Sequence, residues 1–166
     1  MKKSVLLPVF TIVMLCMTGC SSEDENEKGV LSFFSQSGCK TTVSRGSDDV
    51  STLSEQFGNE VVAYKGTDDG SLLISHTNAV FSCDVSIKPT VKIDDDIISI
   101  IESYKPETNC VCCYDLLMKV GPLKEGRYRV FIYNDSSDGT VAPSEPYASF
   151  LIDYNPQVKG EYFLSK

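Results

Sequence analysis

The sequence predicts an all-β domain, a sandwich of about seven to nine short antiparallel strands. Two patterns indicate this fold class. Apolar and polar residues alternate over several short stretches, as they do in strands that bury one face. Glycine, proline, asparagine and aspartate also interrupt the chain about every ten residues, which leaves little room for long helices. A series of short strands and turns of this kind is typical of sandwiches and barrels.

Two β-hairpins are predicted from β-prone runs on either side of a turn. Residues 60–65 and 71–77 flank a turn rich in glycine and aspartate. Residues 90–93 and 97–103 flank three consecutive aspartates at 94–96. Both residue types favour the backbone conformations that turns require, so each pair of runs is expected to form neighbouring antiparallel strands.

Four further strands are predicted from alternation, over residues 80–87, 112–120, 128–133 and 148–154. Every second residue in these stretches is apolar, so one face of each strand is expected to be buried. The residues expected to face the core are Phe81, Cys83, Val85 and Ile87, then Cys112, Tyr114, Leu116, Met118 and Val120, then Tyr128, Val130 and Ile132, and finally Ala148, Phe150 and Ile152.

Residues 47–58 predict a short helix in place of a strand. Ser47 can cap the start of this helix, and Val50, Leu53 and Phe57 would share one of its faces. No other helix is expected in the domain.

The start of the strand at 128–133 indicates which kind of sandwich to expect. Leu123 is followed by Gly126 and then by Tyr128, which opens the alternating run. This segment resembles the tyrosine corner of immunoglobulin-like and fibronectin-type sandwiches. The resemblance implies an antiparallel sandwich of that kind and says nothing about chemistry. The antibody-type core of two cysteines and a tryptophan is excluded, because the chain has no tryptophan.

Residues 1–19 have the three parts of an export signal. Lys2 and Lys3 give a positive start, an apolar run covers residues 5–17, and a glycine precedes Cys20. The apolar run is shorter than the ~20 residues that a membrane span needs, so cleavage is expected. Met17-Thr18-Gly19-Cys20 resembles the lipobox of bacterial lipoproteins. The resemblance implies that Cys20 becomes a lipid-modified N-terminus, and two or more acyl chains would hold the protein firmly on a membrane.

An acidic stretch follows the lipobox and cannot form a core of its own. The Ser-Ser-acidic run at 21–27 resembles the surface-export signal of Bacteroidota lipoproteins, which implies the outer membrane and exposure at the cell surface. The predicted organisation is a signal peptide at 1–19, a lipidated acidic tether at 20–37 and a β-sandwich at 38–166.

The charge balance excludes some classes of partner. Loss of Lys2 and Lys3 with the signal leaves 13 basic and 23 acidic side chains, 13 − 23 = −10. An acidic chain without a basic cluster is a poor nucleic-acid binder, so no nucleic acid is expected. Docking on anionic lipid is also disfavoured, which leaves anchoring to the acyl chains at Cys20.

The cysteines predict disulfides. Five remain after the lipobox, an odd number, and export permits disulfide formation. Cys83 and Cys112 both fall on core-facing positions of separate strands, and Cys110 has the same parity as Cys112. We therefore expect Cys83 to pair with Cys110 or Cys112, with Cys113 left over or tied to Cys39.

Two alternatives remain open for the same residues. His76, Cys83, Cys110 and Cys112 offer the nitrogen and sulfur ligands of a tetrahedral zinc site. The cysteines are also compatible with inert, buried thiols. No cofactor is expected unless the zinc alternative holds.

A wider resemblance covers about residues 60–135. The pattern H-x-N-x-x-F-x-C at 76–83, followed by C-x-C-C-Y-D-L at 110–116, is similar to small uncharacterised lipoproteins of gut Bacteroidota. That resemblance implies a recurring cysteine cluster and carries no activity.

No catalytic set stands out. A serine–histidine–acid triad would have to use His76, the one histidine of the chain, and no G-x-S-x-G elbow is present. We therefore expect a non-catalytic, lipid-anchored binding or envelope-assembly module, whose protein or glycan partner the sequence does not name. The alternative function is a thiol- or zinc-binding module built on His76 and the cysteines.

Overall fold

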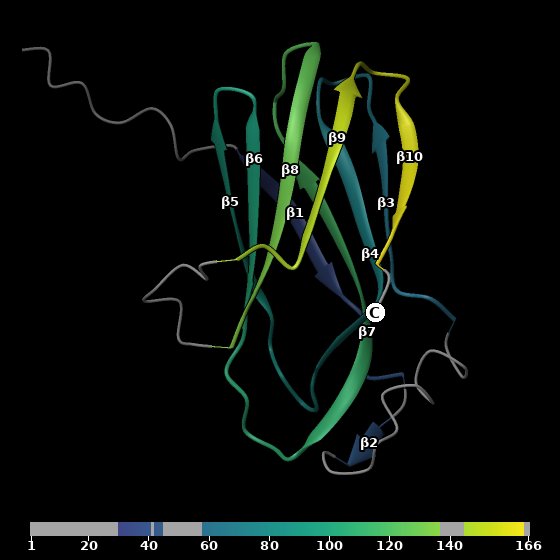
Figure 1. Cartoon of the computed structure of the whole chain (residues 1–166), viewed down its shortest axis with the longest axis vertical. Coiled ribbons are helices and arrows are strands. Elements are labelled where there is room, and N and C mark those ends of the chain that lie inside the picture. Colours follow the sequence, from purple (N-terminus) through teal and green to yellow (C-terminus); the bar gives the residue numbers. More distant parts are fainter. Residues whose placement is uncertain (1–29, 41, 45–57, 137–144, 165–166) are drawn as a thin grey trace, which may run out of the picture.

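The computed structural model describes residues 30–40, 42–44, 58–136 and 145–164. These residues form ten strands and no helix, arranged as two facing sheets (Figure 1). The all-β sandwich expected from the sequence is therefore confirmed. The helix predicted at 47–58 lies outside the described residues except for its last position, Gly58.

One sheet has six strands and the other has four. The six-stranded sheet has the order β1-β7-β4-β3-β10, with β2 also paired to β7, and the four-stranded sheet has the order β5-β6-β8-β9. The β6–β8 pair is parallel and every other described pair is antiparallel. The strands of the first sheet are β1 (Leu31–Gln36), β2 (Thr42–Ser44), β3 (Val61–Gly66), β4 (Leu72–Ser82), β7 (Cys110–Val120) and β10 (Lys159–Phe163). Those of the second are β5 (Lys88–Asp94), β6 (Ile97–Ser103), β8 (Gly126–Asp135) and β9 (Ala148–Tyr154).

Both predicted hairpins are present, as β3–β4 and β5–β6. The sandwich begins earlier than predicted, because β1 starts at Leu31 and lies along β7. The tether boundary expected at residue 37 is therefore wrong. Leu31 and Phe34 pack against the core, and this burial holds a segment whose short alternation gives no clear strand signal.

The separate strands predicted at 71–77 and 80–87 overlap a single long strand, β4, that contains a bulge. The pairing register between β4 and β7 shifts between His76 and Ala79. Asn78 takes a φ of 59° there, a left-handed conformation that asparagine tolerates better than most residues. The bulge changes which parity faces inward, so His76 before it and Phe81 after it are both buried. In the sequence, this bulge corresponds to the point where the inward-facing residues change from even to odd positions.

The tyrosine corner is present where the chain crosses from β7 in one sheet to β8 in the other. The Tyr128 hydroxyl donates a hydrogen bond to the carbonyl oxygen of Lys124 at 3.0 Å. Leu123 and Tyr128 are both buried. The contact fixes the turn between the sheets, as the resemblance implied.

Different contacts close the two long edges of the sandwich. At one edge, the Gln36 side chain on β1 donates to the Val85 carbonyl at 2.8 Å and accepts from the Ile87 amide at 3.0 Å. At the other, Phe150 lies between the rings of Tyr64 and Tyr162, with centroids 5.7 and 5.1 Å away. Within the described residues, no helix has the length and apolar character needed to span a membrane.

Candidate functional site

A group of ionisable side chains lies in the middle of the apolar core. His76 extends inward from β4, and Glu102 extends inward from β6 in the opposite sheet. Glu60 precedes β3 and reaches the same place. These three side chains are 1%, 0% and 4% exposed. Because charged residues are almost never buried this fully without partners, the group is the most unusual chemical feature of the interior.

The geometry favours a doubly protonated His76. Its Nδ1 lies 3.0 and 3.2 Å from the two carboxylate oxygens of Glu102, and its Nε2 lies 3.0 Å from Oε1 of Glu60. An ionised carboxylate only accepts hydrogen bonds, so each ring nitrogen must donate one. His76 is therefore an imidazolium cation held between two carboxylates.

The electrostatic surroundings agree with this assignment. Burial alone lowers the pKa of His76, but the charge and hydrogen bonds of Glu102, followed by those of Glu60, outweigh it and raise the pKa from 6.5 to about 10. The cation therefore persists in the folded protein throughout the physiological pH range.

Tyr147 completes the network from the segment that leads into β9. Its hydroxyl donates a 2.6 Å hydrogen bond to Oε2 of Glu60. Burial and the hydrogen bond to Glu60 raise the pKa of Tyr147, so its proton stays on the phenol. Glu60, Glu102 and Tyr147 thereby surround the His76 cation in one network that draws on both sheets.

This arrangement suits a structural role better than a catalytic one. Both nitrogens of His76 are occupied, and a general base needs a free nitrogen within reach of its substrate. The network therefore fixes the relative position of the two sheets.

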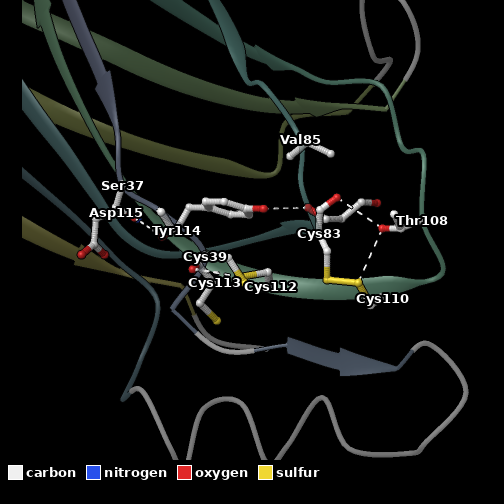
Figure 2. Close-up of a disulfide and its surroundings, with 12 residues drawn as sticks. Ser37, Cys39, Cys83, Val85, Thr108, Cys110, Cys112, Cys113, Tyr114 and Asp115 are labelled. Carbon is white, nitrogen blue, oxygen red and sulfur yellow. Dashed lines mark hydrogen bonds between the residues drawn. A yellow bond between two sulfur atoms is a disulfide. The ribbon is translucent and has the colours of Figure 1, made fainter.

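The cysteines form two disulfides near the C-terminal end of β4 and the N-terminal end of β7 (Figure 2). Cys83 is bonded to Cys110, with Cα atoms 5.5 Å apart. Cys39 is bonded to Cys112, with Cα atoms 5.7 Å apart. Cys113 is buried and belongs to neither bond. The predicted pairing of Cys83 with Cys110 or Cys112 is confirmed as Cys83–Cys110.

The Cys39–Cys112 bond depends on local pairing that the sequence did not reveal. The amide of Lys40 donates to the carbonyl of Cys113 at 3.0 Å, and Thr42 on β2 lies opposite Cys112. These contacts bring the segment after β1 across β7. Cys39 therefore reaches Cys112, and Cys113, which was expected to be left over or tied to Cys39, is in neither disulfide.

The four predicted zinc ligands are not brought together as ligands. Cys83, Cys110 and Cys112 are committed to disulfides, and both nitrogens of His76 bind glutamates. In the described part of the chain, no group of three or more histidine, cysteine, aspartate or glutamate side chains is placed to hold a metal ion. Cys20 lies outside the described residues.

Sequence reasoning missed both glutamates, although a signal for Glu102 was present. Ile98 and Ile100 alternate inward along β6, and Glu102 continues that parity as a buried position. A carboxylate in the apolar register of a strand indicates a buried cationic partner. Glu60 has no such signal, because it lies ahead of its strand.

Comparison with protein-family models, with curated proteins and with solved structures finds no match to this chain.

The first prediction concerns the disulfides. Peptide mapping of the oxidised protein without reductant should recover a Cys83–Cys110 peptide and a Cys39–Cys112 peptide, with Cys113 alkylated only after unfolding because it is buried. Each bond closes a long loop, so its removal should cost roughly 2–4 kcal/mol of stability. Quantitative alkylation of Cys83 in the native protein without reductant would contradict this connectivity.

The second prediction concerns the ion network. Replacing Glu102 with glutamine removes one of the two charges that compensate the buried cation, and should lower the free energy of unfolding by about 3 kcal/mol at neutral pH. Denaturant titration gives this value. Glu107→Gln is the matched control, because Glu107 is exposed and should change stability by less than about 0.5 kcal/mol.

Wild type and Glu102→Gln should also differ in how their free energy of unfolding depends on pH. The pKa of His76 is raised on folding, so the stability it contributes is complete below about pH 6.5 and is lost as the pH rises through about 10. Glu102→Gln should flatten this decline. Equal stability of variant and wild type, or identical slopes over that pH range, would rule out the network as described.

Proposed function

We propose that this chain is an exported lipoprotein, anchored in the cell envelope through Cys20, whose β-sandwich is a non-catalytic binding or envelope-assembly module. The observation that carries the proposal is the pair of disulfides within one small domain. Disulfides form and persist in oxidising compartments outside the cytosol. They therefore support the export that the signal at residues 1–19 implies.

The way the N-terminal segment joins the sandwich also supports anchoring at this end. The proposed tether leads directly into β1, which is hydrogen-bonded along β7. The Cys39–Cys112 disulfide follows three residues after β1 ends and bonds the segment covalently to the same strand. A pull on the lipid anchor would therefore act on the central strands of the six-stranded sheet.

A binding role is proposed in preference to a catalytic one, because both ring nitrogens of the buried His76 are already hydrogen-bonded to glutamates. His76, Glu60 and Glu102 lie inside the core, where a macromolecule or a glycan cannot reach them. The thiol- or zinc-binding alternative has less support, because Cys83, Cys110 and Cys112 are in disulfides and both nitrogens of His76 are hydrogen-bonded to glutamates. The outer membrane and the cell surface remain the proposed location, from the acidic run that follows Cys20.

The third prediction tests the anchor. Cys20→Ser should abolish acyl labelling and release the protein from the membrane fraction or leave it unprocessed, because a hydroxyl replaces the thiol that would carry the diacylglycerol. Cys16→Ser is the matched control: Cys16 lies in the apolar run of the signal, and its loss should leave labelling and fractionation unchanged. Normal acyl labelling and membrane partitioning of Cys20→Ser would refute the lipoprotein proposal.

A further inference from the structure

The four-stranded sheet has an outer face that the core does not use. Side chains that alternate with the buried positions of β5, β6, β8 and β9 lie on this face, and the four strands run side by side in Figure 1. We call these residues the outer face. They are Lys88, Thr90, Lys92 and Asp94 on β5, Ile97, Ser99, Ile101 and Ser103 on β6, Arg127, Arg129, Phe131 and Tyr133 on β8, and Ser149, Leu151 and Asp153 on β9.

Apolar side chains lie on two parts of the outer face. Ile97 and Leu151, which are 37% and 52% exposed, lie towards one end of the sheet on either side of Arg129. The rings of Phe131 and Tyr133 lie next to each other with centroids 6.3 Å apart. All ten described strands belong to the two sheets, so no third layer of described strands covers this face. Exposed apolar side chains that gather on one face are typical of an interaction surface.

The charges of the outer face are mostly uncompensated within the chain. Arg127 is paired with Asp153, with Nε 2.8 Å from Oδ1. By contrast, the described residues offer no side-chain hydrogen bond or ion pair to Arg129, Lys92, Lys88 or Asp94. Aromatic residues and arginine are enriched in protein interfaces, so this composition favours a protein occupant.

The placement of these charges is self-complementary. Lys88 and Asp94 lie at opposite ends of β5, where they pair with Ser103 and Ile97 of β6. A two-fold axis that crosses the strands near Val91 would place Lys88 of one copy opposite Asp94 of the other, twice. In the register of the sheet, the same axis passes between Phe131 and Tyr133 of β8. Phe131 of one copy would then meet Tyr133 of the other.

The alternative two-fold axis, parallel to the strands, is less favourable. It would reverse the strand order and place Arg129 of β8 against Ile97 of β6, and Asp94 of β5 against Leu151 of β9. Burying charges against aliphatic side chains costs free energy without a compensating pair. The charge pattern therefore selects the axis that crosses the strands.

The size of the outer face sets the expected strength. Four strands about 4.8 Å apart and seven residues long, at about 3.4 Å per residue, cover roughly 19 by 24 Å. Two such faces would bury on the order of 900 Å² in projection, which is typical of weak, reversible interfaces.

We infer that the outer face of the four-stranded sheet binds the same face of a second copy of this chain, as a reversible two-fold dimer. Phe131 and Tyr133 form its centre, and Leu151 lies towards one end on the edge strand β9. Lys88 and Asp94 pair reciprocally at its rim. The dimer depends on neither the lipid anchor nor the disulfides.

The fourth prediction tests this dimer by sedimentation of the full chain, in detergent matched in density to the solvent, over a series of protein concentrations. Wild type should shift from monomer to dimer as concentration rises. Tyr133→Asp should weaken the dimer at least about tenfold, because it buries a charge against Phe131 of the second copy. Phe163→Asp is the matched control: Phe163 is 59% exposed on β10 of the other sheet and should dimerise like wild type.

A charge exchange tests the proposed axis. Lys88→Asp and Asp94→Lys should each weaken the dimer, since each places like charges opposite one another. The double variant, and an equimolar mixture of the two single variants, should recover dimerisation. Both residues are exposed, so the exchange spares the core. A wild type that stays monomeric at all concentrations, a Phe163→Asp effect as large as that of Tyr133→Asp, or no recovery in the double variant would overturn the inference.

Discussion

The cation of His76, enclosed between Glu60 and Glu102, is the interaction on which the arrangement of the two sheets depends. The burial of a charge costs several kcal/mol unless its partners have good geometry. Here both ring nitrogens find carboxylates at 3.0 Å, one from each sheet's side of the core. Tyr147 extends the contact to the strand that follows it. A change in the spacing or register of the sheets would leave a buried charge uncompensated, so the network specifies one packing of the sandwich.

The bulge in β4 makes that network compatible with the rest of the core. It lies directly after His76 and restores an inward direction to Ala79 and Phe81, which would otherwise face outward. Polar contacts hold the bulge: Asp115 accepts from the Asn78 amide at 3.1 Å and from Lys40 at 2.5 Å. Lys40 directly follows Cys39 in the chain. The bulge and the Cys39–Cys112 disulfide therefore support the same end of β7.

Local chemistry predicted much of the fold, while features that depend on distant residues escaped it. The two hairpins, the tyrosine corner and the Cys83–Cys110 pairing each follow from short patterns with a clear physical reason. The parallel pairing of β6 with β8 does not, because strand order is set by how the apolar faces combine. The edge strands β1 and β10 also escaped, since they are short and only partly buried. His76 was considered as a zinc ligand because its glutamate partners lie 16 and 26 residues away.

The protonation state of His76 tests this account most directly. The chain has one histidine, so a sample labelled with ¹⁵N in histidine gives a single imidazole signal set in nitrogen-15 NMR. The account predicts a doubly protonated ring, with both nitrogens bearing hydrogens, that stays unchanged as the pH rises past 6.5 and titrates only near pH 10. A neutral tautomer at neutral pH, or a titration close to 6.5, would contradict the buried ion network and the packing that depends on it.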